Sequence, residues 1–355
     1  MDQRRLKAWQ GTRPLVLHCL CVGLALAAGV FAVGADTSAA SAAAAPPTAA
    51  EPVLDDRFPA QVAGFPGQVT GHANLVYATY PGFRPLTLDV YTQGGGHPPR
   101  PLIVYVHGGG WLGGHSRQSG AFADFPGVLA DLAAQGYVVA AVNYRLSGEA
   151  RFPAAIQDVK LALRWLRAHA SEYGIDTAHV IAWGGSAGGQ LAGLVATTCG
   201  SDALAPIPAS GKATVDATLA ATSDCVQGAV LWYGVLDMTS LHPGAGPASA
   251  ESRYLGCEPE ACPTQARLAS PTLMIGPATP PVLLVLGNED RVVPPAQSQQ
   301  FHDAMIAAGR ECELLRLDGV GHSFVGRDEQ ATRAASLQAL AATFAFFRRV
   351  APPVR

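Results

Sequence analysis

The stretch that decides the fold covers residues 179–189 and reads HVIAWGGSAGG. Its first half is a short apolar run typical of a buried strand, and small residues that suit a helix follow it. Ser186 lies between the two in the pattern Gly-x-Ser-x-Gly, formed with Gly184 and Gly188. A tight strand-to-helix turn projects a serine hydroxyl out of the sheet and demands small neighbours. Because the start of the helix also directs N–H groups toward a developing negative charge, we expect Ser186 to be a nucleophile.

On both sides of this stretch, short apolar segments of strand length alternate with segments whose apolar residues recur at helical spacing. In residues 153–170, Ile156, Val159, Leu163 and Leu166 recur at three- and four-residue steps. Strands that alternate with helices predict parallel βαβ units, so we expect an α/β fold with a mostly parallel central sheet and helices on both faces. The expected strands cover residues 74–80, 86–91, 102–106, 137–143, 180–183, 226–233, 281–286 and 313–317. The other expected helices follow Ser186 and cover residues 295–308 and 329–349.

Two loops after the later expected strands supply partners for Ser186. His322 stands among glycines in the loop 319–324, and these glycines allow an imidazole to return over the sheet. Asp290 follows the strand at 281–286 and would orient that imidazole and stabilise its charged form. Glu289 is the alternative acid, and Asp290 would otherwise only cap the following helix. Each of the three residues follows an expected strand, so we expect a catalytic triad of Ser186, Asp290 and His322.

A glycine run, His-Gly-Gly-Gly-Trp at 107–111, directly follows another expected strand. Acyl transfer builds an oxyanion, and backbone N–H groups can bind it where no side chain intervenes. We expect the donors of this oxyanion hole to be Gly109, Gly110 and Ala187, and a glycine-rich loop without a role in the reaction is the alternative. His107 is interpreted as structural. Trp111 is either a wall of the pocket or packing, and the sequence does not choose between them.

These motifs resemble the esterase and lipase branch of the α/β-hydrolase superfamily, near the bacterial feruloyl- and acetyl-esterase-like (BD-FAE-like) enzymes and the hormone-sensitive-lipase group. The resemblance covers about residues 72–350 and also rests on Asn-Tyr-Arg-Leu at 143–146 and a helix that contains Asp158. It implies an α/β-hydrolase fold and two-step acyl transfer through Ser186, with no cofactor and no metal. It also implies that Arg145 and Asp158 form a buried ion pair that serves stability.

The resemblance further implies hydrolysis of carboxylic esters that are small or linked to carbohydrate. An amidase or exopeptidase on the same scaffold is the second interpretation, because the acid catalysis that an amine leaving group needs is not visible in a sequence. A binding protein without turnover is the third, although such proteins usually lose a triad residue and none is missing here. The acyl and alcohol parts of the substrate and the oligomeric state stay open.

Residues 239–278 interrupt the alternation of strands and helices and are rich in Pro, Gly, Ala and Ser. We expect this segment to be an insertion over the mouth of the active site, because so long an excursion is usually functional or mobile.

Seven cysteines are present, and two of them lie near the N-terminus. In an exported chain disulfides are expected between Cys257 and Cys262 and between Cys199 and Cys225, with free thiols as the alternative. Cys312 opens an apolar run and is expected to be a buried thiol.

The N-terminus has the layout of a secretory signal peptide. Four basic residues precede an apolar run at 15–33 and a small-residue site near residue 35. An uncleaved membrane anchor is the alternative, because the run approaches the roughly 18 residues that span a bilayer. We expect a signal peptide at 1–35, a disordered linker and lead-in at 36–71, and a catalytic domain at 72–350, in a secreted, periplasmic or cell-envelope protein.

Charge excludes one class of partner. The chain has a formal charge of −3, and without residues 1–35 it carries 20 basic and 26 acidic side chains. No basic stripe remains to bind phosphates, so we expect no nucleic-acid partner. We also expect no stable membrane span once residues 1–35 are removed. Hydrophobic residues make up 49% of the chain, which allows a sizeable core.

Overall fold

A mostly parallel sheet organises the chain in the computed structural model, which describes residues 61–207, 213–242 and 244–353. Within these residues the sheet has nine strands in the order β1-β2-β3-β5-β4-β6-β7-β8-β9. Neighbours from β1 to β5 in this order pair antiparallel, and neighbours from β5 to β9 pair parallel. The strands are β1 Gln61–Phe65, β2 Val69–Ala78, β3 Leu86–Gln93, β4 Arg100–Val106, β5 Val138–Val142, β6 Ile175–Gly185, β7 Gly228–Trp232, β8 Val282–Gly287 and β9 Cys312–Leu317. The predicted α/β fold is confirmed.

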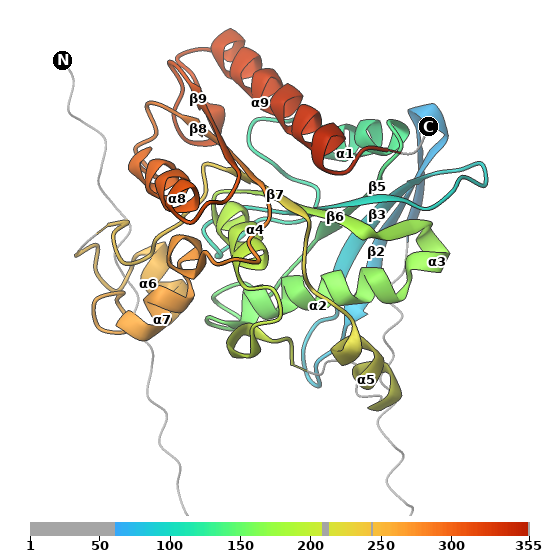
Figure 1. The fold of residues 1–355 in the computed structure, drawn as a ribbon, viewed down its shortest axis with the longest axis horizontal. Helices are drawn as coiled ribbons and strands as arrows, with labels where there is room; N and C mark the ends of the chain where they lie inside the picture. Colours follow the sequence, from blue (N-terminus) through green and yellow to red (C-terminus); the bar gives the residue numbers. More distant parts are fainter. Residues whose placement is uncertain (1–60, 208–212, 243, 354–355) are drawn as a thin grey trace, which may run out of the picture. The chain divides into compact units, whose positions relative to one another are not determined.

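Helices cover both faces of this sheet (Figure 1). Side chains of α2, α4 and α8 belong to one hydrophobic core, which includes Ile156, Leu191 and Phe301. Side chains of α1 and α9 belong to a second core, which includes Phe125 and Phe347. The sheet therefore lies between two apolar layers. The helices are α1 Phe125–Ala134, α2 Ala154–Ala168, α3 Ala170–Tyr173, α4 Ala187–Thr197, α5 Ala213–Ala221, α6 Ala250–Leu255, α7 Pro263–Leu268, α8 Ala296–Ala307 and α9 Glu329–Val350.

The central strands are continuous apolar runs because both of their faces are covered. Every residue of β4, β7 and β8 is buried, which is the pattern of parallel strands between two helix layers. Since neighbouring strands are parallel here, their carboxyl ends lie at one edge of the sheet. The loops that follow β4, β6, β8 and β9 meet at this edge, where α/β folds bind their ligands.

The sheet begins earlier in the chain than the sequence predicted. β1 starts at Gln61 and β2 starts at Val69, so the last part of the expected linker, residues 61–71, contains strand. Gly64, Gly67 and Gly71 weaken the apolar alternation that would have revealed these strands. The expected signal peptide at 1–35 and the rest of the expected linker lie outside the described residues.

Two disulfides join the cysteine pairs that the sequence predicted. The Cα atoms are 4.7 Å apart in Cys199–Cys225 and 6.2 Å apart in Cys257–Cys262. Cys312 is unpaired and partly buried, and burial raises the pKa of its thiol to about 12. This thiol therefore stays protonated at neutral pH and is a poor nucleophile.

The segment 239–278 contains α6 and α7, which the Cys257–Cys262 disulfide connects. Hydrogen bonds fix both ends of the segment. Ser270 Oγ accepts the N–H of Met238 at 2.8 Å, and Thr272 N–H donates to Leu236 O at 3.0 Å. These hydrogen bonds join the two ends of the segment to each other, close to the end of β7.

Arg145 and Asp158 form the buried ion pair that the sequence predicted. The Arg145 Nη2 to Asp158 Oδ1 distance is 2.7 Å, and the aspartate side chain has no solvent exposure. Asp158 Oδ2 also accepts the backbone N–H of Arg145 at 2.8 Å, and the guanidinium lies 4.4 Å from the centroid of the Tyr80 ring. The pair connects the loop after β5 to α2.

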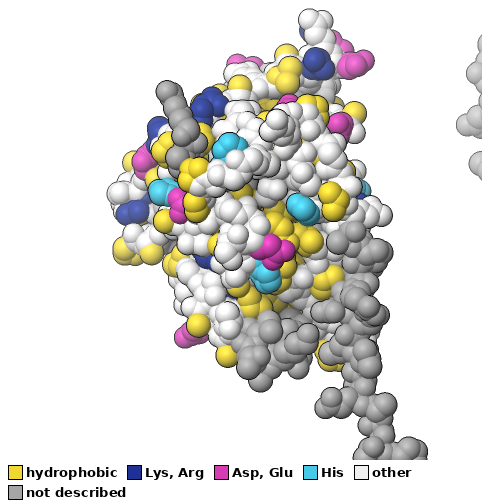
Figure 2. All heavy atoms as spheres, turned by 90° about the vertical axis from the view of Figure 1, so that its right-hand side faces the viewer, with side chains coloured by type: hydrophobic (Ala, Val, Ile, Leu, Met, Phe, Trp, Pro, Cys, Tyr) yellow, Lys and Arg dark blue, Asp and Glu magenta, His cyan; other side chains and the backbone are white. Residues whose placement is uncertain are grey.

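Charged side chains are dispersed on the face that Figure 2 shows. Lys and Arg side chains there are few and stand apart from one another, among acidic, histidine and hydrophobic side chains. This dispersion agrees with a chain in which 14% of residues are charged. Within the described part of the chain, no helix has the length and apolar character needed to cross a membrane.

Candidate active site

Ser186 lies at a sharp turn between β6 and α4. Its φ of 56° and ψ of −122° are strained for a residue that carries a side chain. The turn is bound to β7, because Ser186 N–H donates to Trp232 O at 2.9 Å. A Cβ atom on Gly184 would collide with Gly188 O, and a Cβ atom on Gly188 would collide with Val106 O. Close backbone packing therefore requires both glycines of the Gly-x-Ser-x-Gly pattern.

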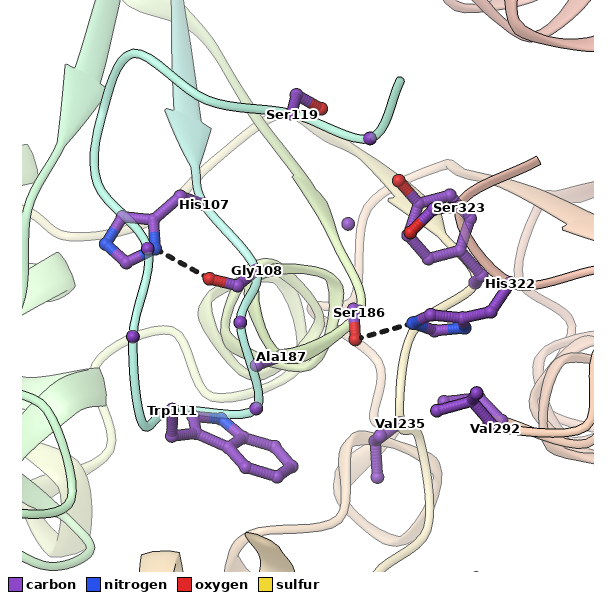
Figure 3. A pocket seen from close by; sticks show the side chains of 18 of the residues that line it. His107, Gly108, Trp111, Ser119, Ser186, Ala187, Val235, Val292, His322 and Ser323 are labelled. Atoms are coloured by element: carbon purple, nitrogen blue, oxygen red, sulfur yellow. Dashed lines mark hydrogen bonds between the residues drawn. The ribbon is translucent and has the colours of Figure 1, made fainter. Parts of the chain in front are cut away.

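His322 lies between Ser186 and Asp290. His322 Nε2 is 3.0 Å from Ser186 Oγ, and His322 Nδ1 is 2.8 Å from Asp290 Oδ2. Figure 3 shows the imidazole and the serine hydroxyl pointing toward one another in the pocket. A neutral imidazole that donates from Nδ1 to the carboxylate has its Nε2 lone pair free to accept the serine proton. The structure thus brings together the three residues that the sequence selected.

Asp290 is fixed by its own loop after β8. Its Oδ1 accepts the N–H groups of Val292 at 2.8 Å and Val293 at 2.9 Å, which leaves Oδ2 for the imidazole. These N–H groups precede α8, so the carboxylate does not cap that helix. Asp290 is buried, whereas the alternative acid Glu289 is exposed.

His322 begins a single 3₁₀ turn, His322–Phe324, after β9. Gly321 N–H donates to Val325 O at 2.8 Å and closes this turn. The loop passes directly over the end of β8, where a Cβ atom on Gly287 would collide with Val320 O. From the sequence, we attributed the close approach of this loop to the sheet to the glycines of the loop itself. The structure shows that Gly287 in β8 is also needed, because it leaves room for the loop backbone.

The glycine loop after β4 lies directly against the serine turn. A Cβ atom on Gly108 would lie 2.7 Å from Gly185 O. Gly109 and Gly110 have φ angles of 112° and 60°, a region that L side chains rarely adopt. Among the described residues, the N–H groups of Gly109, Gly110 and Ala187 donate to no protein acceptor. All three residues border the pocket beside the serine, so three unpaired donors surround one cavity.

Trp111 closes the glycine loop and serves both as packing and as a pocket wall. Its indole is 1% exposed and stacks on Tyr254 of α6, with ring centroids 4.4 Å apart. Trp111 Nε1–H donates to Gln190 Oε1 of α4 at 3.1 Å. Gln190 Nε2–H in turn donates to Ala269 O at 2.8 Å. The loop is therefore tied both to the helix behind Ser186 and to the segment 239–278.

His107 holds the start of the same loop. Its buried ring stacks on Tyr144 with centroids 4.3 Å apart, and its Nδ1 lies 2.8 Å from Gly108 O. Burial lowers the pKa of His107 to about 4, so the ring is neutral at ordinary pH. In Figure 3 it lies across the loop from His322. These contacts agree with a structural role for His107.

The pocket at this edge has a volume of about 510 Å³ and contains Ser186 and His322 (Figure 3). The segment 239–278 contributes Ala250 and Glu251 to its wall. Apolar and small side chains form much of the remaining wall, among them Val235, Val292, Val293 and Ser119. Within the described ranges, no cluster of His, Cys, Asp and Glu side chains could hold a metal ion.

Tyr233 belongs to this site, although the sequence analysis assigned it no role there. Its ring meets His322 edge-on, with centroids 4.9 Å apart, and it borders the pocket. Burial raises the pKa of Tyr233 to about 12, so the phenol adds no charge beside the imidazole. The signal that could have found it is its position directly after β7, at the edge where the other loops meet.

A family comparison decides where this chain belongs. The model of the family described as BD-FAE matches residues 88–305, which is more than half of the chain. The chain belongs to the BD-FAE family. The matched residues include Ser186 and Asp290, whereas His322 lies beyond the match, so its selection rests on its loop and its geometry.

Relatives and solved structures agree with the BD-FAE assignment. Esterase LipC of Mycobacterium tuberculosis is 31% identical over 228 residues, which are 64% of this chain and 53% of LipC. The structure of a truncated form of a carbohydrate esterase from gut microbiota is 25% identical with a TM-score of 0.67, and the match covers 81% of this chain and 98% of that one. Propionate-bound esterase 2 of Thermogutta terrifontis is 27% identical with a TM-score of 0.63, over 83% of this chain and 96% of that one. The chain spans about half the length of the curated mycobacterial relatives that it matches.

Proposed function

We propose that this BD-FAE family chain hydrolyses carboxylic esters through an acyl-enzyme formed on Ser186. The observation that carries the proposal is the unbroken line of contacts from Asp290 Oδ2 through the two His322 nitrogens to Ser186 Oγ. A serine hydroxyl alone is a weak nucleophile, and a neighbouring neutral imidazole activates it by removing its proton. The esterase relatives and the carbohydrate esterase structure add support for an ester substrate.

In the first step, Ser186 Oγ attacks the ester carbonyl carbon while His322 Nε2 takes the hydroxyl proton. The carbonyl oxygen becomes an oxyanion, which the N–H groups of Gly109, Gly110 and Ala187 stabilise. One such donor contributes roughly 3 kcal/mol to a transition state of this kind. The Asp290 carboxylate stabilises the imidazolium that forms. His322 then gives its proton to the leaving alcohol, and the acyl group remains as an ester on Ser186.

In the second step, water enters the place of the alcohol. His322 Nε2 takes a proton from this water, and the oxygen attacks the acyl carbon under the same three N–H groups. Collapse of the oxyanion breaks the bond to Ser186 Oγ, which recovers its proton from His322. The products are the free acid and the unchanged serine. These residues complete the cycle with no cofactor and no metal.

Small or carbohydrate-linked esters are the proposed substrates. The pocket of about 510 Å³ has room for a short acyl group, and Val235 and Val292 offer it an apolar wall. Two structural relatives point the same way, since one is a carbohydrate esterase and another was solved with propionate bound. Glu251 also borders the pocket and gives its wall a polar group that an alcohol can contact.

We further propose that the chain is exported through a signal peptide at 1–35. Basic residues followed by an apolar run predict export, and the two disulfides suit an oxidising compartment. N-terminal sequencing of the exported protein is expected to begin near residue 36. A chain that keeps its first residues and partitions with membranes would instead support the uncleaved anchor.

The proposed function is tested by labelling with a fluorophosphonate and locating the modified residue. Ser186 is expected to carry the label, and Ser186→Ala is expected to take none and to lose roughly 10⁴-fold or more of kcat for p-nitrophenyl acetate. Labelling elsewhere, or unchanged ester turnover by Ser186→Ala, would contradict the proposal. A parallel panel of p-nitroanilides tests the amidase alternative, which predicts faster turnover of anilides than of esters.

A further inference from the structure

A second pocket lies next to the one that contains Ser186. Its volume is about 390 Å³, and at two places consecutive residues of the chain border the first pocket and then the second. Trp111 borders the first pocket and Leu112 borders the second, while Glu251 borders the first and Ser252 borders the second. The two pockets are therefore neighbours across the end of the glycine loop and the start of α6.

Two arginines without partners line this second pocket. Arg151 and Arg253 are both exposed, and within the described residues neither guanidinium has a hydrogen bond or an ion pair. Several other arginines have carboxylate partners, as in the pairs Arg84–Glu149, Arg117–Asp89 and Arg164–Asp224. Arg267, Arg291 and Arg333 are also without a partner among the described residues, but they stand apart, whereas Arg151 and Arg253 line one pocket together.

The fold holds the Arg151 stem in place at this pocket. A Cβ atom on Gly256 would lie 2.4 Å from Arg151 Cδ, so the aliphatic stem packs closely against this glycine. The backbone beside the arginine is fixed as well, because Phe152 N–H donates to Tyr254 O at 2.7 Å. Gly256 has a φ of 84° and ends α6, which brings the arginine stem against the helix terminus. The stem of Arg151 therefore lies against the end of α6, and its exposed guanidinium lines the pocket.

A further polar group in this pocket also lacks a partner. Ser147 Oγ is buried and makes no hydrogen bond among the described residues. Its own backbone is fixed to the glycine loop, since Ser147 N–H donates to Trp111 O at 2.7 Å. A buried hydroxyl without a partner costs free energy. Glu258 is the one carboxylate among the lining residues, so the two guanidinium groups leave the lining net positive.

We propose that this arginine pocket, defined by Arg151, Arg253 and Ser147, binds a carboxylate of the substrate beyond its ester group, such as that of an acidic sugar residue. Guanidinium groups match the planar carboxylate and donate two parallel hydrogen bonds to it. The pocket adjoins the ester site through Trp111 and α6, so one extended molecule can occupy both. The inference rests on the proposed ester hydrolysis and adds a substrate class to it.

The test uses a matched pair of acetylated xylo-oligosaccharides, one with a glucuronic acid branch and one with that carboxyl group reduced to the alcohol. The wild type is expected to show a kcat/KM roughly tenfold higher for the acidic member, mainly through KM. Arg151→Gln and Arg253→Gln are expected to bring this ratio near one. Arg253→Glu, which reverses the charge, is expected to bring it below one.

Arg267→Gln is the matched control, because Arg267 is an exposed arginine of the same segment and lies outside both pockets. It is expected to keep the wild-type ratio. Equal rates for both substrates in the wild type, or a ratio unchanged in both Gln variants, would overturn the arginine pocket. Ester hydrolysis by Ser186 would still stand if p-nitrophenyl acetate is cleaved and Ser186 is labelled. Failure of all ester turnover would instead reject the proposed function.

Discussion

The indole of Trp111 lies flat on the phenol ring of Tyr254, with centroids 4.4 Å apart and planes inclined by 10°. Trp111 is the last residue of the glycine loop, and Tyr254 belongs to α6 in the segment 239–278. The segment therefore supports the loop that carries two of the proposed oxyanion donors. The same segment also borders the pocket through Ala250 and Glu251.

This contact predicts that Tyr254 affects the rate more than substrate binding. Tyr254→Leu removes the flat surface and frees the glycine loop, so kcat for p-nitrophenyl acetate is expected to fall roughly tenfold or more with a smaller change in KM. Tyr254→Phe keeps the ring and is expected to remain within about threefold of the wild type. Steady-state kinetics of the two variants checks the prediction. Equal rates for the Leu and Phe variants would show that the stack does not position the loop.

We predict that a side chain at Gly108 disturbs the serine turn, whereas a side chain at Gly113 does not. A Cβ atom at Gly108 would lie 2.7 Å from Gly185 O and 3.3 Å from Ser186 Cβ, whereas one at Gly113 would have nothing within 4 Å. Gly108→Ala is expected to reduce kcat/KM at least roughly 100-fold by shifting the serine turn. Gly113→Ala in the same loop is expected to keep most of the activity. Similar losses in both variants would point to general loop disorder and away from this contact.

The buried ion pair predicts a large effect on stability. Asp158→Asn leaves Arg145 without its charge partner and is expected to lower the free energy of unfolding by about 3–5 kcal/mol. Glu149→Gln, which weakens the exposed pair with Arg84, is expected to cost about 1 kcal/mol or less. Urea denaturation of both variants measures the difference. A decrease in the free energy of unfolding below 1 kcal/mol for Asp158→Asn would show that the ion pair contributes little to stability.

His107 predicts a loss of stability in mild acid. Its pKa is about 4 in the fold, against about 6.5 in an unfolded chain. Between these values the unfolded chain binds a proton that the folded chain does not, so stability falls as pH falls. The loss from this residue is expected to reach about 2 kcal/mol at pH 5. His107→Asn removes the group, and its urea midpoint should change less between pH 7 and pH 5 than that of the wild type. An equal change in both proteins would disprove the prediction.

The strands from β3 onward and the positions of Ser186, Asp290 and His322 could be predicted from the sequence for one physical reason. β4 and β8 are buried along their whole length and β6 is buried from Val180 onward, so each strand ends in a continuous buried run where a loop begins. Residues that follow parallel strands must meet at one edge of the sheet. The positions of these residues along the chain were therefore enough to predict that their side chains lie close together.

Contacts between distant segments could not be predicted in this way. Gln190 lies 79 residues from Trp111 in the chain, and no local pattern connects them. Tyr254 stands in a segment without strand or helix periodicity that the sequence analysis could use. The need for glycine at position 287 follows from the backbone of the His322 loop, which passes too close for a Cβ atom there. β1 was missed for a local reason, since its glycine neighbours hide the strand pattern.

The most direct test of the central claim, that Ser186 and His322 act as one unit, compares Ser186→Ala, His322→Ala and the double variant on p-nitrophenyl acetate. Residues that act as a unit are not additive, so each single variant is expected to lose roughly 10⁴- to 10⁶-fold of kcat and the double variant no more than the worse single one. Losses that multiply in the double variant, or activity that survives in Ser186→Ala, would contradict the account.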